Sequence, residues 1–105
     1  MPLTREFKET VKARADADPA FRAALLSEAV SLLLEGDVDT GKAVLRDYIN
    51  ATVGFEDLAD NVRKSPKRLH RMFGPNGNPS ADNLFAVISQ LQKATGVQLA
   101  VGERK

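Results

Sequence analysis

The sequence predicts an all-α protein built as a five-helix bundle, with one short C-terminal segment as a candidate β-strand. Apolar residues recur at i, i+3 and i+4 through most of the 105 residues, which is the spacing of helices that bury one face. Three helix starts carry a capping side chain, followed in two cases by proline: Asp18-Pro19, Ser65-Pro66 and Ser80. Apolar–polar alternation, which marks a half-buried strand, is almost absent.

Composition places the chain among soluble globular proteins. A chain of 105 residues forms one domain, or one small domain with an attached arm. It has no cysteine, so it has neither disulfides nor thiolate metal sites. Its N-terminal residues are charged and lack the apolar core of an export signal, and no apolar run approaches the roughly 20 residues of a membrane span. We therefore expect a soluble, cytoplasmic protein.

The net charge of +1 conceals an uneven distribution. Residues 15–62 carry ten acidic and three basic side chains, whereas residues 63–80 carry five basic side chains and no acidic one. A basic island on an acidic body attracts a polyanion to one surface and repels it from the rest. The alternative is a solvated cationic helix face without a ligand.

An arm and a strongly apolar helix come first. Residues 1–17 are expected to form a charged helix, over Thr4–Arg14, or an arm, and residues 18–105 the helical domain. In the helix over Pro19–Leu34, 11 of 16 residues are apolar, more than a one-sided surface helix carries. This helix is therefore either the central core helix or one that buries a second face on another chain.

The segment Gly36–Lys42 matches the first seven positions of a phosphate-binding loop, G-x-x-x-x-G-K. Ala43 occupies the eighth position, so the hydroxyl that would bind magnesium is missing. The segment also follows a helix instead of a buried strand. We interpret it as a connector to the next helix, Thr40–Thr52, with Asp37 or Asp39 as the cap. In that helix we expect Tyr48 in the core, with its hydroxyl at the rim.

Residues 55–74 predict two short helices joined by a tight turn, that is, a helix-turn-helix. The first helix has one apolar stripe, formed by Phe55, Leu58, Ala59 and Val62. Arg63-Lys64 makes the turn, and Ser65-Pro66 begins the second helix. That helix buries Leu69, Met72 and Phe73 and leaves Lys67, Arg68, His70 and Arg71 towards solvent.

A turn-rich loop, a third helix and a short tail complete the chain. The loop over residues 74–79 reads GPNGNP, and Ser80 caps a helix that ends at Gly96. After that glycine, Val97–Val101 alternates well enough for one strand. Such a strand would pair with a second copy or a partner's sheet edge, or the segment would lie along the last helix.

These residues resemble a known family. The matching positions are Leu58, Ala59, Ser65, Leu69, Arg71, Met72, Gly77, Asn78, Pro79, Ser80, Leu84 and Ile88. Their spacing is similar to that of lambda-repressor-like (Xre/Cro type) helix-turn-helix proteins. The segment around Asn78–Leu84 and the tail resemble bacterial addiction-module antidote proteins, which are HigA-like antitoxins. Arg63 departs from the family, which usually has glycine there, so Arg63 is left-handed or the turn is built differently.

The resemblance implies a dimeric, sequence-specific DNA-binding transcriptional regulator. It would be the antitoxin of a toxin–antitoxin module, bind a palindromic operator of its own operon, and bind a RelE/ParE-like toxin. The second helix would enter the major groove while the first braces across the backbone. The expected base or phosphate contacts are Lys67, Arg68 and Arg71. The expected phosphate contacts are Lys64, Ser65, Asn76 and Asn78, with His70 either a phosphate contact or simply exposed.

No other chemistry is indicated. The single histidine, His70, has no partner at metal-ligand spacing, and the sequence shows no nucleophile–base pairing. We therefore expect no metal, no cofactor and no enzymatic activity. The alternative to DNA binding is a protein–protein interaction module that uses the apolar 19–34 helix.

Overall fold

The fold is known from a computed structural model, which describes residues 5–103. In this part of the chain six helices follow one another and no strand occurs. They are α1 (Arg5–Ala17), α2 (Pro19–Leu34), α3 (Val38–Ala51), α4 (Phe55–Val62), α5 (Pro66–Met72) and α6 (Ala81–Thr95). The all-α prediction is confirmed. The five helices expected after residue 18 are present, and Thr4, where the N-terminal helix was expected to begin, lies outside the described residues.

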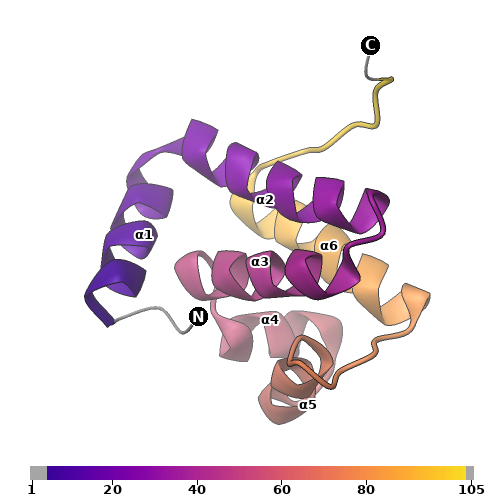
Figure 1. Cartoon of the computed structure of the whole chain (residues 1–105). Helices are drawn as coiled ribbons and strands as arrows, with labels where there is room; N and C mark the ends of the chain where they lie inside the picture. The colour runs from indigo at the N-terminus through magenta and orange to yellow at the C-terminus, as the bar shows by residue number, and fades with distance from the viewer. Residues whose placement is uncertain (1–4, 104–105) are drawn as a thin grey trace.

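The central helix of the fold is α3. It lies between α2 on one side and the pair α4 and α5 on the other, with α6 behind them (Figure 1). Leu45, Tyr48 and Ile49 of α3 are fully buried, and they belong to a core that includes residues of α2, α4, α5 and α6. Helix α1 packs across α2 and α3.

Of the two alternatives for α2, the structure does not bear out its place as the central core helix. Only Leu26 and Ala29 of α2 are buried, and Leu34 at its end is 71% exposed. Helix α3 is more buried than α2 because it has helices on both sides, whereas α2 packs mainly on α3 and α1. The sequence alternative, in which α2 buries a second face on another chain, stays a prediction.

The predicted helix starts are confirmed at atomic detail. A carboxylate oxygen of Asp18 accepts from the N–H groups of Ala20 and Phe21, at 3.0 and 3.3 Å. The Ser80 hydroxyl oxygen accepts from Asn83 N at 3.2 Å. Helix α3 begins two residues before the expected Thr40, and Asp37 is its cap. Each cap satisfies an amide that the first turn of a helix leaves without a partner.

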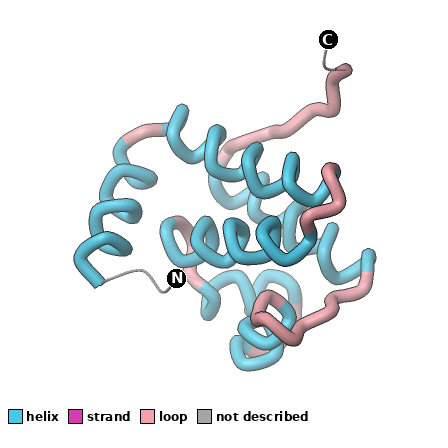
Figure 2. Tube along the Cα trace, viewed as in Figure 1, coloured by secondary structure: helices cyan, strands magenta, loops and turns pink. Residues whose placement is uncertain are grey.

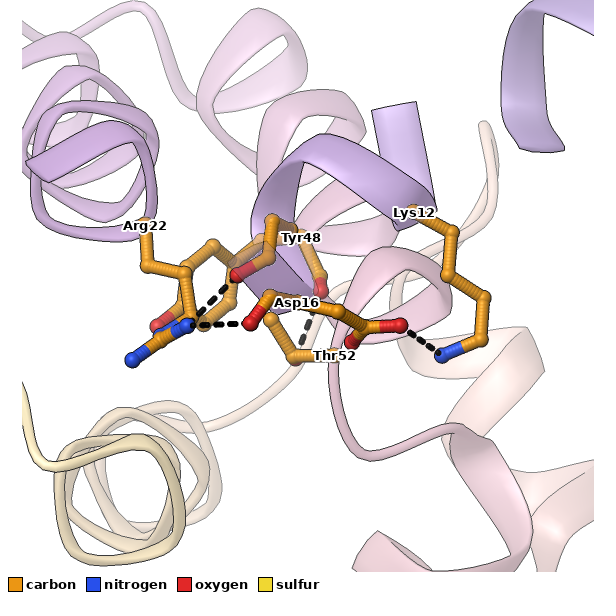
Figure 3. Close-up of polar contacts among 6 residues, drawn as sticks. Lys12, Asp16, Arg22, Tyr48 and Thr52 are labelled. Carbon is orange, nitrogen blue, oxygen red and sulfur yellow. Dashed lines mark hydrogen bonds and ion pairs between the residues drawn. The ribbon is translucent and has the colours of Figure 1, made fainter. Parts of the chain in front are cut away.

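The junction of α1 and α2 is held by one arginine, shown in Figure 3. Arg22 Nη1 donates to the carbonyl oxygens of Ala15 and Asp16, at 2.6 and 3.4 Å, which lie in the last turn of α1. A cation at this end of a helix also interacts favourably with the helix dipole. Ala15 is fully buried, and α1 continues to Ala17, past the expected Arg14. The described part of the N-terminal segment is therefore a helix packed on the body.

Of the alternatives for the C-terminal segment, the structure shows a loop along the last helix and no strand over residues 97–101. Residues 97–101 have no regular secondary structure and leave the end of α6 as an extended loop (Figure 2). Val97 is buried against the core, and the N–H of Leu99 donates to Gln92 Oε1 of α6 at 2.8 Å. A lone strand has no neighbour for its backbone groups. Here the side chain of Gln92 in α6 accepts a hydrogen bond from the backbone of the segment. The segment therefore lies along α6.

Tyr48 links the central helix to α6. Its hydroxyl donates to Thr95 Oγ1 at 2.8 Å, and Thr95 donates in turn to the carbonyl of Leu91 at 2.8 Å. The core placement of Tyr48 is confirmed, although its side chain is fully buried and its hydroxyl does not reach the rim. Burial raises the pKa of Tyr48, while the hydrogen bond with Thr95 and the charge of Arg22 act in the opposite direction.

We expect Tyr48→Phe to lower the free energy of unfolding by about 0.5–1.5 kcal/mol at neutral pH, because it removes one buried hydrogen bond. Since folding raises the pKa of Tyr48, the associated stability is fully present below the ordinary tyrosine value of about 10 and is lost as the pH rises through the folded-state value. Urea unfolding at neutral and alkaline pH should therefore show a smaller alkaline loss in the variant.

The chain offers a direct control for this experiment. Tyr48 is the only tyrosine and there is no tryptophan, so tyrosinate absorbance reports this one side chain. A folded parent in which tyrosinate forms at the ordinary pKa, or equal alkaline losses in parent and variant, would contradict the expected shift.

Candidate nucleic-acid interface

The helices α4 and α5 form a compact unit that buries one side and exposes the other. The buried side chains are Phe55, Leu58 and Ala59 of α4, Leu69 and Met72 of α5, and Phe73 directly after α5. All six belong to the same hydrophobic core. The predicted apolar sets of both helices are thus confirmed, apart from Val62, which is half-buried. Because this side is anchored, the opposite side of α5 is held in a fixed direction.

The turn between the helices contains a left-handed arginine. Arg63 has φ 57° and ψ 46° and ends α4, and the N–H of Lys64 donates to the carbonyl of Ala59 at 3.0 Å. Of the two conformations that the sequence left open, the chain adopts the left-handed one. This region crowds the Cβ atom of any residue other than glycine, at a cost of about 1–2 kcal/mol.

Five cations surround this turn, and we call them the basic surface. They are Arg63, Lys64, Lys67, Arg68 and Arg71. Four are exposed, and Lys64 is half-buried. Within the part of the chain that the structure describes, none of their side chains takes part in an ion pair or hydrogen bond. The acids of α4 are exposed and form no ion pair with these cations among the described residues, so the five charges are open to a ligand.

His70 lies against α4. Its ring stacks on Phe55 with 3.9 Å between the ring centroids and 22° between the ring planes. This stacking adds a contact between α4 and α5 that the sequence did not predict, since His70 was expected to face solvent. The residue remains exposed on its other side, so a phosphate contact from its ring edge stays a prediction.

The three remaining predicted residues lie at the two ends of α5. At the start, Ser65 Oγ accepts from Arg68 N at 3.1 Å, so its oxygen caps the helix and its hydroxyl proton is left to donate. Beyond the end, Asn76 and Asn78 are exposed on either side of Gly77. The structure thus brings all eight predicted residues onto α5, its preceding turn and its following loop.

A buried lysine of the central helix holds that loop. Lys42 of α3 is 4% exposed, and its Nζ donates to the carbonyls of Gly77 and Gly74, at 2.6 and 3.4 Å. Asp39 lies 3.7 Å from the same ammonium group. The spacing of Lys42, Leu45 and Ile49 could have revealed it, because i, i+3 and i+7 lie on one helix face.

Two glycines are required by close packing. An added Cβ at Gly77 would clash with the carbonyl oxygens of Arg71 and Met72, so the loop folds directly onto the end of α5. In α3, an added Cβ at Gly41 would lie 2.8 Å from Leu33 Cδ2. Gly41 therefore lets α2 and α3 approach each other. The G-x-x-x-x-G-K match ends inside a helix and does not form a phosphate-binding loop, and its interpretation as a helix connector is confirmed.

Comparisons with known proteins do not identify the chain, because no family model, no curated protein and no solved structure matches it. In residues 5–103 no three histidine, cysteine or acidic side chains gather where they could hold a metal ion. None of the described helices has the length and apolar character needed to cross a membrane. The basic surface and the contacts that support it are therefore the features that bear on function.

We expect Lys42→Met to lower the free energy of unfolding by about 1–3 kcal/mol, because the variant leaves the carbonyls of Gly74 and Gly77 without their donor. Methionine keeps most of the volume, so the loss reports the ammonium group. Thermal or urea unfolding measures it. Equal stability of parent and variant would show that solvent replaces the ammonium without cost.

Gly77→Ala should destabilise the fold by about 1–3 kcal/mol, since backbone atoms cannot yield as a flexible side chain can. Gly102→Ala is the matched control, because nothing lies within 4 Å of a Cβ built at Gly102. That variant should stay within about 0.5 kcal/mol of the parent. Equal unfolding midpoints for the two variants would argue against the close approach of the loop to α5.

Proposed function

We propose that this protein is a sequence-specific DNA-binding transcriptional regulator, in which α4, the turn and α5 act as a lambda-repressor-like helix-turn-helix. The observation that carries the proposal is the basic surface. Five cations, with no ion-pair or side-chain hydrogen-bond partner among residues 5–103, surround one short, anchored helix. The 48 residues before them, 15–62, carry ten acids and three bases. Such a field draws a polyanion to α5 and away from the rest of the molecule.

In this proposal α5 lies in the major groove and reads base edges with Lys67, Arg68 and Arg71. Positions 67, 68 and 71 follow the i, i+1 and i+4 spacing, and all three side chains are exposed. Arginine and lysine pair with the O6 and N7 atoms of guanine. Lys64, Ser65, Asn76 and Asn78 then contact phosphates on either side and fix the register of α5. The hydrogen bonds of Lys42 to this loop fix the backbone that carries Asn76 and Asn78.

Two-fold symmetry completes the proposed DNA complex. One short reading helix makes few contacts, and two copies on a palindrome double them. We therefore propose a homodimer on a palindromic operator of its own operon, in the cytoplasm of a bacterium. The exposed apolar residues Leu34 and Val38, at the corner between α2 and α3, support a contact with another chain.

The particular regulator we propose is the antitoxin of a toxin–antitoxin module, with a RelE/ParE-like toxin as its partner. This step rests on the sequence resemblance to addiction-module antidote proteins. Two tests address it directly. A small basic RelE-like reading frame should lie beside the gene, and co-expression of its product with this chain should give a complex that co-purifies. A neighbouring gene of another kind, or two products that purify apart, would remove the antitoxin assignment.

The second candidate is a protein–protein interaction module that does not bind DNA. The exposed apolar end of α2 favours it, because Leu34 is 71% exposed in a helix with 11 apolar residues of 16. A salt titration separates the two candidates. Binding to DNA weakens steeply as salt rises, since each neutralised phosphate releases a counterion, whereas apolar association does not weaken in this way.

We expect Arg68→Ala and Arg71→Ala each to weaken operator binding by about 1–3 kcal/mol and to relax base preference. The assay is fluorescence anisotropy with duplex DNA from upstream of the gene, at one fixed salt concentration. Lys93→Ala is the matched control, because it removes an exposed cation of α6 away from the basic surface. If either arginine variant binds as tightly as the parent, that residue is not a base reader.

A further inference from the structure

The backbone at Arg63 is exceptional in this chain. Four described residues have a positive φ: Gly36 at 88°, Gly54 at 80°, Gly96 at 75° and Arg63 at 57°. Glycine occupies three of these positions, where it adopts a positive φ without steric cost. Among residues 5–103, a side chain occupies the left-handed region only at the turn before α5. Strain that persists in a native structure is a reason to look for a function at that site.

The turn leaves no other residue to take this conformation. The Lys64 N–H is bonded to Ala59 O at 3.0 Å, which closes the end of α4. Ser65 is extended, with φ −73° and ψ 148°, as expected for a residue that precedes proline. Pro66 already begins α5. Arg63 must therefore reverse the chain, and glycine there would do so more easily.

The guanidinium of Arg63 is not used by the fold. The side chain is exposed, and among the described residues it has no ion-pair or hydrogen-bond partner. A cation at the end of α4 gains some energy from the helix dipole. Lys64, the next residue, offers a charge at the same helix end with an ordinary φ. The dipole therefore does not by itself explain why the strained position carries an arginine.

We infer that Arg63 is itself a nucleic-acid-binding residue, whose guanidinium takes a phosphate of the DNA backbone. This inference rests on the proposed function and adds a site residue to it. A turn between a bracing helix and a reading helix faces the backbone of the duplex and not its base edges. Guanidinium matches the phosphate geometry with two parallel N–H donors. Glycine at this position would relieve the strain but would have no group to bind a phosphate.

The inference predicts opposite changes in stability and binding for one substitution. Arg63→Gly removes the left-handed strain, so its thermal unfolding midpoint should rise by about 2–5 °C. Its affinity for a short mixed-sequence DNA duplex should fall roughly eightfold at about 0.1 M salt, and the slope of log K against log salt should become shallower by about 0.9, the value of one phosphate contact. Arg63→Lys should keep the parent slope.

The controls make each outcome decisive. Lys93→Ala removes the same amount of charge from α6 and should leave the slope unchanged. If Arg63→Gly is more stable but binds with the parent's affinity and slope, the inference is wrong. If the Arg63→Gly variant is less stable than the parent, Arg63 stabilises the end of α4 and the inference is also wrong. A parent that binds no duplex overturns the proposed function itself, whereas a parent that binds as well as Arg63→Gly overturns only the role of Arg63.

Discussion

The buried ammonium group of Lys42 is the contact on which the candidate site depends. From the central helix it donates hydrogen bonds to two carbonyls of the loop that follows α5. These carbonyls belong to residues more than thirty positions away in the sequence. A buried charge is costly unless polar groups surround it, and the carbonyls of Gly74 and Gly77 are those groups. The loop can reach the lysine because Gly77 has no side chain to hold it off the end of α5.

The same central helix fixes the other elements. Tyr48 of α3 ties α6 through Thr95, and Leu45 and Ile49 fill the core. Arg22 of α2 donates a hydrogen bond to the end of α1, and α2 itself packs along α3. Of these contacts, the hydrogen bond between Tyr48 and Thr95 joins residues 47 positions apart in the sequence. The fold is thus organised around α3, although α2 is the more apolar helix, because position in the bundle and not composition decides which helix is central.

A helix as short as α5 is unstable by itself, since isolated helices need roughly 12–15 residues. Its seven residues are held by the cap at Ser65, the buried side chains Leu69 and Met72, the stacking of His70 on Phe55, and the loop fixed by Lys42. These supports all lie on or beside the buried face. Because the buried face is anchored, the exposed face of α5 keeps a fixed direction, as the proposed DNA readout would require. Arg63 is left-handed and, among the described residues, has no ion-pair or hydrogen-bond partner, which is the observation behind its proposed phosphate contact.

Short-range chemistry in the sequence determined much of this protein. The caps at Asp18, Ser65 and Ser80, the apolar stripes of α4 and α5, and the charge island at residues 63–71 depend on neighbours within a few positions, and all were predictable. The left-handed Arg63 was one of two predicted conformations. Tertiary structure decided the rest: the burial of Lys42, the stacking of His70, the outer position of α2 and the loop at residues 97–101. These features depend on which helices pack against one another in the bundle. Such contacts join residues that are distant in the sequence, so no local sequence pattern indicates them.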